Sequence, residues 1–259
     1  RLVTSDTSVT PYGGGTWASR GAGIGGEAVL LAGLALKENI LKIAAAMLQV
    51  EASTLALKQG KVIDRMTNAE KLPLSEIGRV GYFRTDTLPK DLQADLTVTR
   101  HYSQKDFPFI FTNGVQASYV EVDTNTGFVK LLKHWAVEDC GRVINPMLVD
   151  EQMRGAIVQG IGGALFEECL YDDMGQMING NMADYLVPMA AEMPDIEVAH
   201  VQTPTKSSLL GAKGAGEAGT AGAPGAVINA INDALAPFNV HSFDQPLTPE
   251  KILKALGTI

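Results

Sequence analysis

The 259-residue sequence has few of the side chains from which proteins build disulfide frameworks and metal centres. Its two cysteines, Cys140 and Cys169, are too few for a disulfide framework or for an iron–sulfur cluster within the chain, since such clusters usually need four thiolates. The four histidines lie far apart without HxH or HExxH spacing, which argues against a histidine-based metal site. We interpret Cys140 as a buried structural thiol, with a nucleophile as the alternative.

Positive charge and long apolar runs are also scarce. The formal net charge is −8 and no basic cluster with interleaved aromatic residues occurs, so nucleic acid is not expected as a main partner. Lys37, Glu38 and Lys42 interrupt the apolar stretch 28–50, which indicates a helix of a folded domain and not a membrane span. No GxSxG or P-loop motif is present. The sequence begins with Arg1, so the lack of a targeting signal says little about its compartment.

Glycine, in contrast, is abundant, with 27 residues that gather in loops able to approach a ligand closely. The densest run, residues 211–224, contains one carboxylate, Glu217, and leads into a predicted helix over 226–236. A single carboxylate among small residues would lie in a tight, partly dry pocket, where it would serve as a general base. The alternative is a glycine-rich turn with a surface glutamate, and the residues alone leave both open.

A second glycine run, residues 21–26, has the GxGxxG spacing of a dinucleotide-binding loop. Such a loop should follow a hydrophobic strand, whereas this one follows a polar segment, so an NAD-binding dehydrogenase is the weaker interpretation. We expect instead that hydroxyl and amide groups of residues 16–19, at the start of a helix over 23–48, bind an anionic ligand. Together with a third loop, residues 139–146, these segments could surround a large polar ligand such as a pterin or a nucleotide.

The remaining patterns predict an α+β fold of mixed hairpins and long helices, without the regular βα alternation of a doubly wound sheet. Alternating residues over 115–123 and 128–137, joined by a Thr-Asn-Thr-Gly turn, predict a β-hairpin. Apolar residues spaced four apart predict a helix over 148–171. The other expected elements are a hairpin at 53–64, helices at 74–82 and 246–256, the latter capped by Thr248, and strands at 96–101 and 196–201.

Three segments, in this order along the chain, resemble the molybdenum hydroxylase family, which includes xanthine dehydrogenase, aldehyde oxidase and aerobic carbon monoxide dehydrogenase. They are Gly15-Thr16-Trp17-Ala18-Ser19-Arg20, Asp139-Cys140-Gly141-Arg142-Val143-Ile144-Asn145-Pro146 and Lys213-Gly214-Ala215-Gly216-Glu217-Ala218-Gly219-Thr220. The resemblance covers nearly the whole chain, 1–259, and is to the C-terminal, molybdenum cofactor-binding region of the large subunit. It implies the fold of that region and allows a division into two α+β lobes near residues 105–115.

The resemblance also implies an oxidoreductase activity, the hydroxylation of an aldehyde or an aromatic N-heterocycle with oxygen derived from water. In that family the glutamate at the position of Glu217 takes a proton from a molybdenum-bound hydroxyl group, hydride passes to the metal centre, and electrons leave to other chains. Cofactor binding is carried over by motif position to a set of residues in the three segments and the helix between them. They are Thr16, Ala18, Ser19, Asn145, Gln152, Lys213, Gly214 and Gly216.

The implied cofactor is molybdopterin, in its cytosine dinucleotide form, whose dithiolene holds molybdenum without a direct protein ligand. [2Fe–2S] clusters and FAD are expected on partner chains of a heteromer: an iron–sulfur subunit, an FAD subunit and the other part of the molybdenum-binding subunit. A cytoplasmic location is expected, with the periplasm as the alternative. The alternative function is a non-catalytic subunit or fragment that completes a cofactor site in a larger complex.

Overall fold

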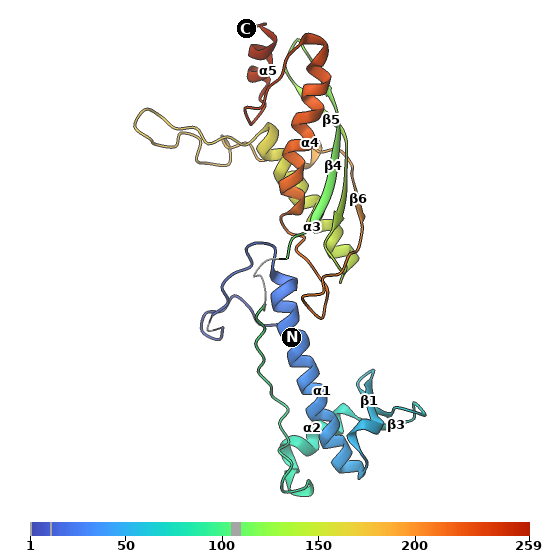
Figure 1. Ribbon diagram of the computed structural model, residues 1–259. Coiled ribbons are helices and arrows are strands. Elements are labelled where there is room, and N and C mark those ends of the chain that lie inside the picture. Colours follow the sequence, from blue (N-terminus) through green and yellow to red (C-terminus); the bar gives the residue numbers. More distant parts are fainter. Residues whose placement is uncertain (1, 11, 105–109) are drawn as a thin grey trace. The chain divides into compact units, whose positions relative to one another are not determined.

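The computed structural model describes residues 2–10, 12–104 and 110–259, which belong to two compact units (Figure 1). The larger unit consists of residues 1–23 together with 105–259, and the smaller unit consists of residues 24–104. The chain thus starts in the larger unit, forms the smaller one and then returns, which the sequence analysis did not anticipate. Within the described ranges, no helix is both long and apolar enough to cross a membrane.

The smaller unit packs two helices against a three-stranded antiparallel sheet. Its elements are α1 (Glu27–Leu48), β1 (Leu55–Lys58), β2 (Lys61–Asp64), β3 (Glu70–Pro73) and α2 (Leu74–Phe83), with strand order β1-β2-β3. The core joins Ile43 of α1 to Leu55, Val62 and Ile77. The predicted hairpin and the predicted helix at 74–82 are confirmed, whereas the four-residue β3 was missed. The predicted strand at 96–101 is wrong, because Leu96 packs against the core but its segment has no strand partner among the described residues.

The larger unit carries two helices on one face of a second three-stranded sheet (Figure 1). Its elements are β4 (Asn113–Val122), β5 (Val129–Asp139), α3 (Pro146–Leu165), β6 (Ile196–His200), α4 (Ala218–Leu235) and α5 (Pro249–Leu256). Strands β4 and β5 form the predicted antiparallel hairpin, and β6 pairs with β5 in parallel, so the strand order is β4-β5-β6. The parallel pair is connected through α3, as such a pair requires a crossover.

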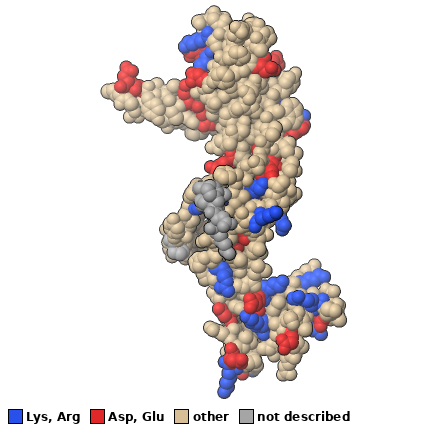
Figure 2. Space-filling view, viewed as in Figure 1, with Lys and Arg blue, Asp and Glu red and all other residues tan. Residues whose placement is uncertain are grey.

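The two faces of this sheet differ in what covers them. On the inner face, Ala136 of β5 packs with Ile157 of α3 and Val227 of α4 in one apolar core. On the outer face, Tyr119 and Trp135 are exposed, as the period of two along a strand requires. In Figure 2, charged side chains of both signs crowd the smaller unit, whereas wide areas of the larger unit carry none.

Glycines set the distance between α3 and α4. A Cβ atom added at Gly219 of α4 would lie 2.8 Å from the Cβ of Ala156 and 2.8 Å from the backbone nitrogen of Ile157. A Cβ atom at Gly160 of α3 would lie 2.9 Å from the Cβ of Ala223. These glycines lower helix propensity, but they allow the two backbones to pack in direct contact.

Both long helices of this unit differ in extent from the prediction. α4 begins at Ala218 and not at 226, because the small residues after Glu217 are already helical and Pro224 lies inside the helix. α3 ends at Leu165 and not at 171, because the N–H groups of the next two residues both bond to the carbonyl of Gly162 and close the last turn. The predicted strand at 196–201 and the cap of α5 by Thr248 are confirmed.

Candidate cofactor-binding site

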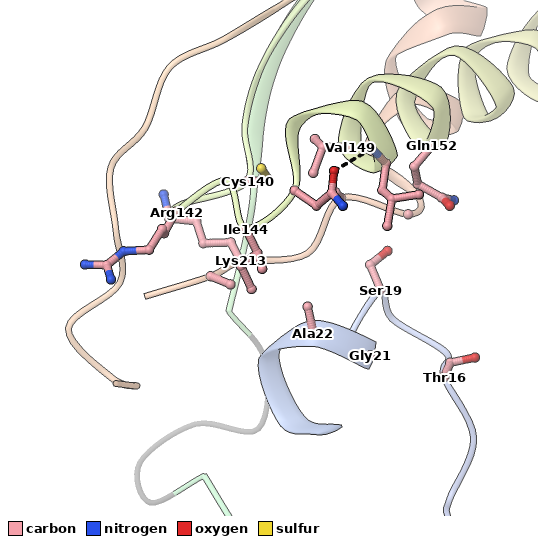
Figure 3. Close-up of a pocket in the computed structure, with 15 residues that line it drawn as sticks. Thr16, Ser19, Gly21, Ala22, Cys140, Arg142, Ile144, Val149, Gln152 and Lys213 are labelled. Atoms are coloured by element: carbon pink, nitrogen blue, oxygen red, sulfur yellow. Dashed lines mark hydrogen bonds between the residues drawn. The ribbon is translucent and has the colours of Figure 1, made fainter. Parts of the chain in front are cut away.

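A pocket of about 460 Å³ lies in the larger unit, where the N-terminal segment faces the turn after β5 and the first turns of α3 (Figure 3). Its lining residues are Thr16, Ser19, Gly21, Ala22, Cys140, Arg142, Ile144, Asn145, Leu148, Val149, Gln152, Ala212, Lys213, Ala215 and Gly216. Six of the nine site residues named from the sequence are in this lining. The other three, Ala18, Gly214 and Glu217, adjoin lining residues in the chain.

The N-terminal segment brings Thr16 and Ser19 to the pocket (Figure 3). Residues 12–20 contain no strand, and Gly21–Gly26 forms a π-helical turn that continues into α1. A dinucleotide-binding loop would join a strand to a helix. The GxGxxG spacing therefore does not have the context that an NAD site requires.

The first turn of α3 forms another wall of the pocket. Asn145 is its N-cap, and the Oδ1 atom accepts a hydrogen bond from the N–H of Leu148 at 3.3 Å, with Pro146 as the first helical residue. Leu148 and Gln152 then line the pocket. The N-terminal end of this helix therefore adjoins the pocket. Because this end carries partial positive charge, it would favour an anionic group there.

Lys213 lines the pocket, but its ammonium group is already bonded to two protein side chains, the buried Asp139 and the exposed Thr203. The Nζ atom lies 2.9 Å from Oδ2 of Asp139 and 2.7 Å from Oγ1 of Thr203. Burial alone would raise the pKa of Asp139, yet hydrogen bonds from Thr203, Lys213 and the N–H of Gly141 together hold that pKa well below its ordinary value. The ion pair neutralises much of the charge of Lys213. The other cationic residue of the described lining is Arg142.

Arg142 was not singled out in the sequence analysis, although it lies within the segment 139–146 that was. The signal that could have found it is a cation inside a turn that also holds a helix cap, Asn145. Cys140, in the same turn, is buried as predicted. Burial, together with the nearby charges of Asp139 and Glu138, raises the pKa of the Cys140 thiol, which disfavours the thiolate that a nucleophile needs.

Glu217 stands at the N-terminus of α4 and is exposed. The predicted partly dry pocket is therefore wrong for the residues described, because the small neighbours of Glu217 fold into a turn and a helix without apolar side chains to cover it. The exposure of Glu217 agrees with the alternative interpretation, a glycine-rich turn with a surface glutamate. The side chain is nevertheless held in place, since Ser19 Oγ donates to Glu217 Oε2 at 2.8 Å and accepts from the Glu217 N–H at 2.8 Å.

A chain of polar side chains links the sheet to the first turn of α4. The Nε2 atom of Gln116 donates to the carbonyl oxygens of Ala218 at 3.3 Å and Gly219 at 3.1 Å. The Oε1 atom of Gln116 lies 3.1 Å from Nε2 of His134, so we assign the His134 proton to Nε2. The Nδ1 atom of His134 then accepts from the hydroxyl of Ser118 at 2.8 Å.

The same network includes the buried carboxyl group of Glu138, which accepts a hydrogen bond from Gln116 at 3.3 Å. Burial raises the pKa of Glu138 and lowers that of His134 to about 4, because both charged forms are poorly solvated there. This network was not predicted from the sequence. Its signal is the placement of Gln116 and Ser118 at inward positions of β4, where apolar residues would be expected.

The chemistry of the donor set suits an anionic ligand with several hydrogen-bond acceptors. Thr16, Asn145 and Gln152, which carry a hydroxyl group and two amides, line the pocket beside the N-terminus of α3, together with Arg142. Among the residues that the structure describes, no aspartate or glutamate is part of the lining. A pterin that carries phosphate groups fits such a site, since each donor would replace a bond to water.

Comparisons with known proteins show the family to which the chain belongs. Residues 1–194 match the sequence model of a family described as a molybdopterin cofactor-binding domain. The chain is 37% identical over 244 residues to the nicotine 6-hydroxylase large subunit of Paenarthrobacter nicotinovorans, covering 94% of this chain and 30% of that one. It is 30% identical over 256 residues to the carbon monoxide dehydrogenase large chain of Hydrogenophaga pseudoflava, covering 99% of this chain and 31% of that one.

A comparison with solved structures also finds molybdenum hydroxylases. Quinoline 2-oxidoreductase from Pseudomonas putida 86 superposes with a TM-score of 0.86 at 37% identity, over 95% of this chain and 31% of that one. The chain thus spans about a third of the length of the relatives it matches, and the α+β fold expected from the resemblance is confirmed. The chain belongs to the molybdopterin cofactor-binding domain family and corresponds to part of the molybdenum-binding subunit of the molybdenum hydroxylases.

Proposed function

We propose that this chain is the part of a molybdenum hydroxylase that holds the cofactor and supplies its general base, Glu217. The substrate class is an aromatic N-heterocycle or an aldehyde. The heterocycle is favoured by two relatives at 37% identity, whose names contain nicotine and quinoline.

The observation that carries the proposal is the position of one ordered carboxylate beside a pocket of hydrogen-bond donors. Glu217 directly follows the lining residue Gly216, and it is bonded to the lining residue Ser19. The described part of the lining contains cationic and neutral donors but no carboxylate. An acid–base catalyst needs such an arrangement, in which a proton acceptor adjoins the site of reaction without repelling an anionic cofactor.

The roles of the chain's own groups follow from their bonds. The Oε2 atom of Glu217 is occupied by the Ser19 hydroxyl, so we assign proton transfer to Oε1. When bound, the molybdenum cofactor would supply the two-electron oxidation of the substrate carbon. Residues proposed to hold it are Thr16, Ala18, Asn145, Gln152, Lys213, Gly214 and Gly216.

The remaining assignments rest on the family. We propose molybdopterin in its cytosine dinucleotide form, and [2Fe–2S] clusters and FAD on partner chains. The partners would be the rest of the molybdenum-binding subunit, an iron–sulfur subunit and an FAD subunit, in a cytoplasmic heteromer. The share of the relatives that this chain covers, about a third, supports the need for further polypeptide.

Two measurements test the proposal. Metal analysis of the complex purified from its native source, with mass spectrometry of the accompanying chains, should give about one molybdenum per copy together with an iron–sulfur subunit. Glu217→Gln should then lower turnover by about 10²–10⁴-fold at unchanged molybdenum content, since that is the usual contribution of a general base. Glu121→Gln, which changes an exposed carboxylate on β4, is the matched control.

The outcomes separate the catalytic function from the alternative. Near wild-type turnover of Glu217→Gln would remove this residue from the reaction. Normal molybdenum content with no turnover in the wild-type complex on any heterocycle or aldehyde would favour a non-catalytic part that completes a cofactor site. Absence of both molybdenum and partner chains would overturn the proposal as a whole.

A further inference from the structure

We infer that Ser19 is a positioning residue for Glu217 and not a ligand of the cofactor, an inference that rests on the proposed function. Ser19 lines the pocket, and motif position assigns it to cofactor binding. Its hydroxyl group, however, has a different partner.

The hydrogen-bond inventory of Ser19 is decisive. A hydroxyl group has one proton to donate. At 2.8 Å from Oγ, the Oε2 atom of Glu217 takes that proton, and the N–H of Glu217, also at 2.8 Å, donates to the same Oγ atom. While these bonds exist, Ser19 has no proton left for a phosphate or a pterin carbonyl group.

The backbone around Ser19 is strained to reach this position. Ala18 and Ser19 have φ angles of 57° and 54°, the left-handed region that residues other than glycine avoid at a cost of about 1–2 kcal/mol each. Such a conformation persists only where its surroundings determine it. Two consecutive residues of this kind next to the proposed base indicate that the placement of the Ser19 hydroxyl has a function.

Two glycines of the opposite segment make room for Ser19. A Cβ atom at Gly214 would lie 2.8 Å from the Cβ of Ser19, and one at Gly216 would lie 3.2 Å from its Oγ atom. At both positions the first atom that a side chain would meet belongs to Ser19. The Gly-x-Gly spacing before Glu217 therefore serves the approach of the N-terminal segment, in addition to any approach of a ligand.

The consequence for the carboxylate is a fixed orientation. An exposed glutamate side chain samples several rotamers, and ordering one costs up to about 2 kcal/mol. Glu217 is exposed, so packing does not order it. The two bonds to Ser19 fix its backbone and one carboxylate oxygen, which directs the other oxygen before the substrate binds.

The experiment compares variants of the molybdenum-loaded complex by kcat, KM, molybdenum content and melting temperature. Ser19→Ala and Ser19→Gly should each lower kcat about 10–100-fold, with KM and molybdenum content unchanged, because both remove the hydroxyl group and only misplace the base. Ser8→Ala is the matched control, since it removes another serine that donates to a carboxylate, Asp6, at 2.6 Å. Its kinetic constants should equal those of the wild type.

A double-variant cycle gives a readout that a general structural role would not produce. Gly214→Ala should lower kcat to a similar extent by displacing Ser19, and it should have little further effect in the Ser19→Gly background, where the clash is removed. Additive losses would contradict the inference. Loss of molybdenum in Ser19→Ala, or a Ser19→Gly variant with wild-type kcat, would overturn it.

The two hypotheses fail in different ways. Full turnover of Glu217→Gln rejects the proposed function whatever Ser19 does. An inactive Glu217→Gln with fully active Ser19→Ala leaves the proposed function intact and overturns the positioning role.

Discussion

Lys213, assigned by motif position to cofactor binding, forms an ion pair with the buried Asp139, at 2.9 Å between Nζ and Oδ2. Their side chains are only 10% and 11% exposed, so the pair is largely removed from water. We predict that Asp139→Asn, which keeps the shape but removes the charge, lowers the free energy of unfolding by about 3–5 kcal/mol, because the Lys213 charge is left uncompensated. Urea unfolding at pH 7 measures this loss.

Two further variants give this prediction its controls. Glu197→Gln breaks the exposed pair with Lys133 and should cost less than about 1 kcal/mol. Asp139→Asn combined with Lys213→Met should recover most of the lost stability, since neither charge of this pair remains. Recovered stability with loss of molybdenum from this double variant would assign Lys213 to cofactor binding as well, whereas an Asp139→Asn loss below 1 kcal/mol would contradict the prediction.

The crossing of α3 and α4 predicts opposite effects for two substitutions in one helix. Gly219→Ala places a Cβ atom 2.8 Å from the backbone of α3 and should destabilise the protein by about 1–3 kcal/mol, because backbone cannot move aside cheaply. Gly225→Ala meets nothing within 4 Å and should stabilise it by about 0.4–1 kcal/mol. Thermal melting of both variants checks the signs, and equal signs would show that the crossing is less tight than described.

The sequence predicts elements that local patterns determine and misses relationships that tertiary contacts determine. The hairpin of β4 and β5 has alternation and a turn motif, and Thr248 is a cap of the usual type, so both could be predicted. The contact of Ser19 with Glu217 joins residues 198 positions apart and has no local signal. The helical state of residues 218–225 also escaped prediction, because it depends on the packing of small residues against α3.

The buried His134 predicts a loss of stability on acidification. Burial lowers its pKa from 6.5 to about 4, so between these values the unfolded chain binds a proton that the folded chain does not. The free energy of unfolding therefore has its full value above pH 6.5 and decreases as the pH falls toward 4. The total loss is about 3 kcal/mol at 1.36 kcal/mol per unit of pKa. Urea midpoints of the wild type and His134→Gln, measured between pH 7.5 and 4.5, give the difference in slope.

The wild type must be compared with His134→Gln because Glu138, whose pKa is raised, makes both proteins more stable as the pH falls, which opposes the effect of His134. His241→Gln changes an exposed histidine and should keep the wild-type slope. Identical slopes for the wild type and His134→Gln would mean that His134 does not titrate with a lowered pKa.

The two cysteines should differ sharply in reactivity. Cys169 is exposed, whereas Cys140 is buried with a raised pKa, so little of its thiolate is present at neutral pH. Iodoacetamide at pH 7.5 should modify Cys169 within minutes and Cys140 only after denaturation. Peptide mass spectrometry over a time course checks this, and comparable rates at both positions would contradict the burial of Cys140.

The return of the chain to the larger unit has a consequence for biosynthesis. Residues 1–23 leave the ribosome before the smaller unit, and the segments that complete their pocket follow only after the smaller unit has been made. At a synthesis rate of about 5–20 residues per second, Glu217 is made roughly 10–40 s after Ser19. Throughout that interval a nascent chain has one wall of the pocket without the other. We therefore expect insertion of the cofactor to follow the synthesis of residues 212–216, which supply the last part of the pocket lining.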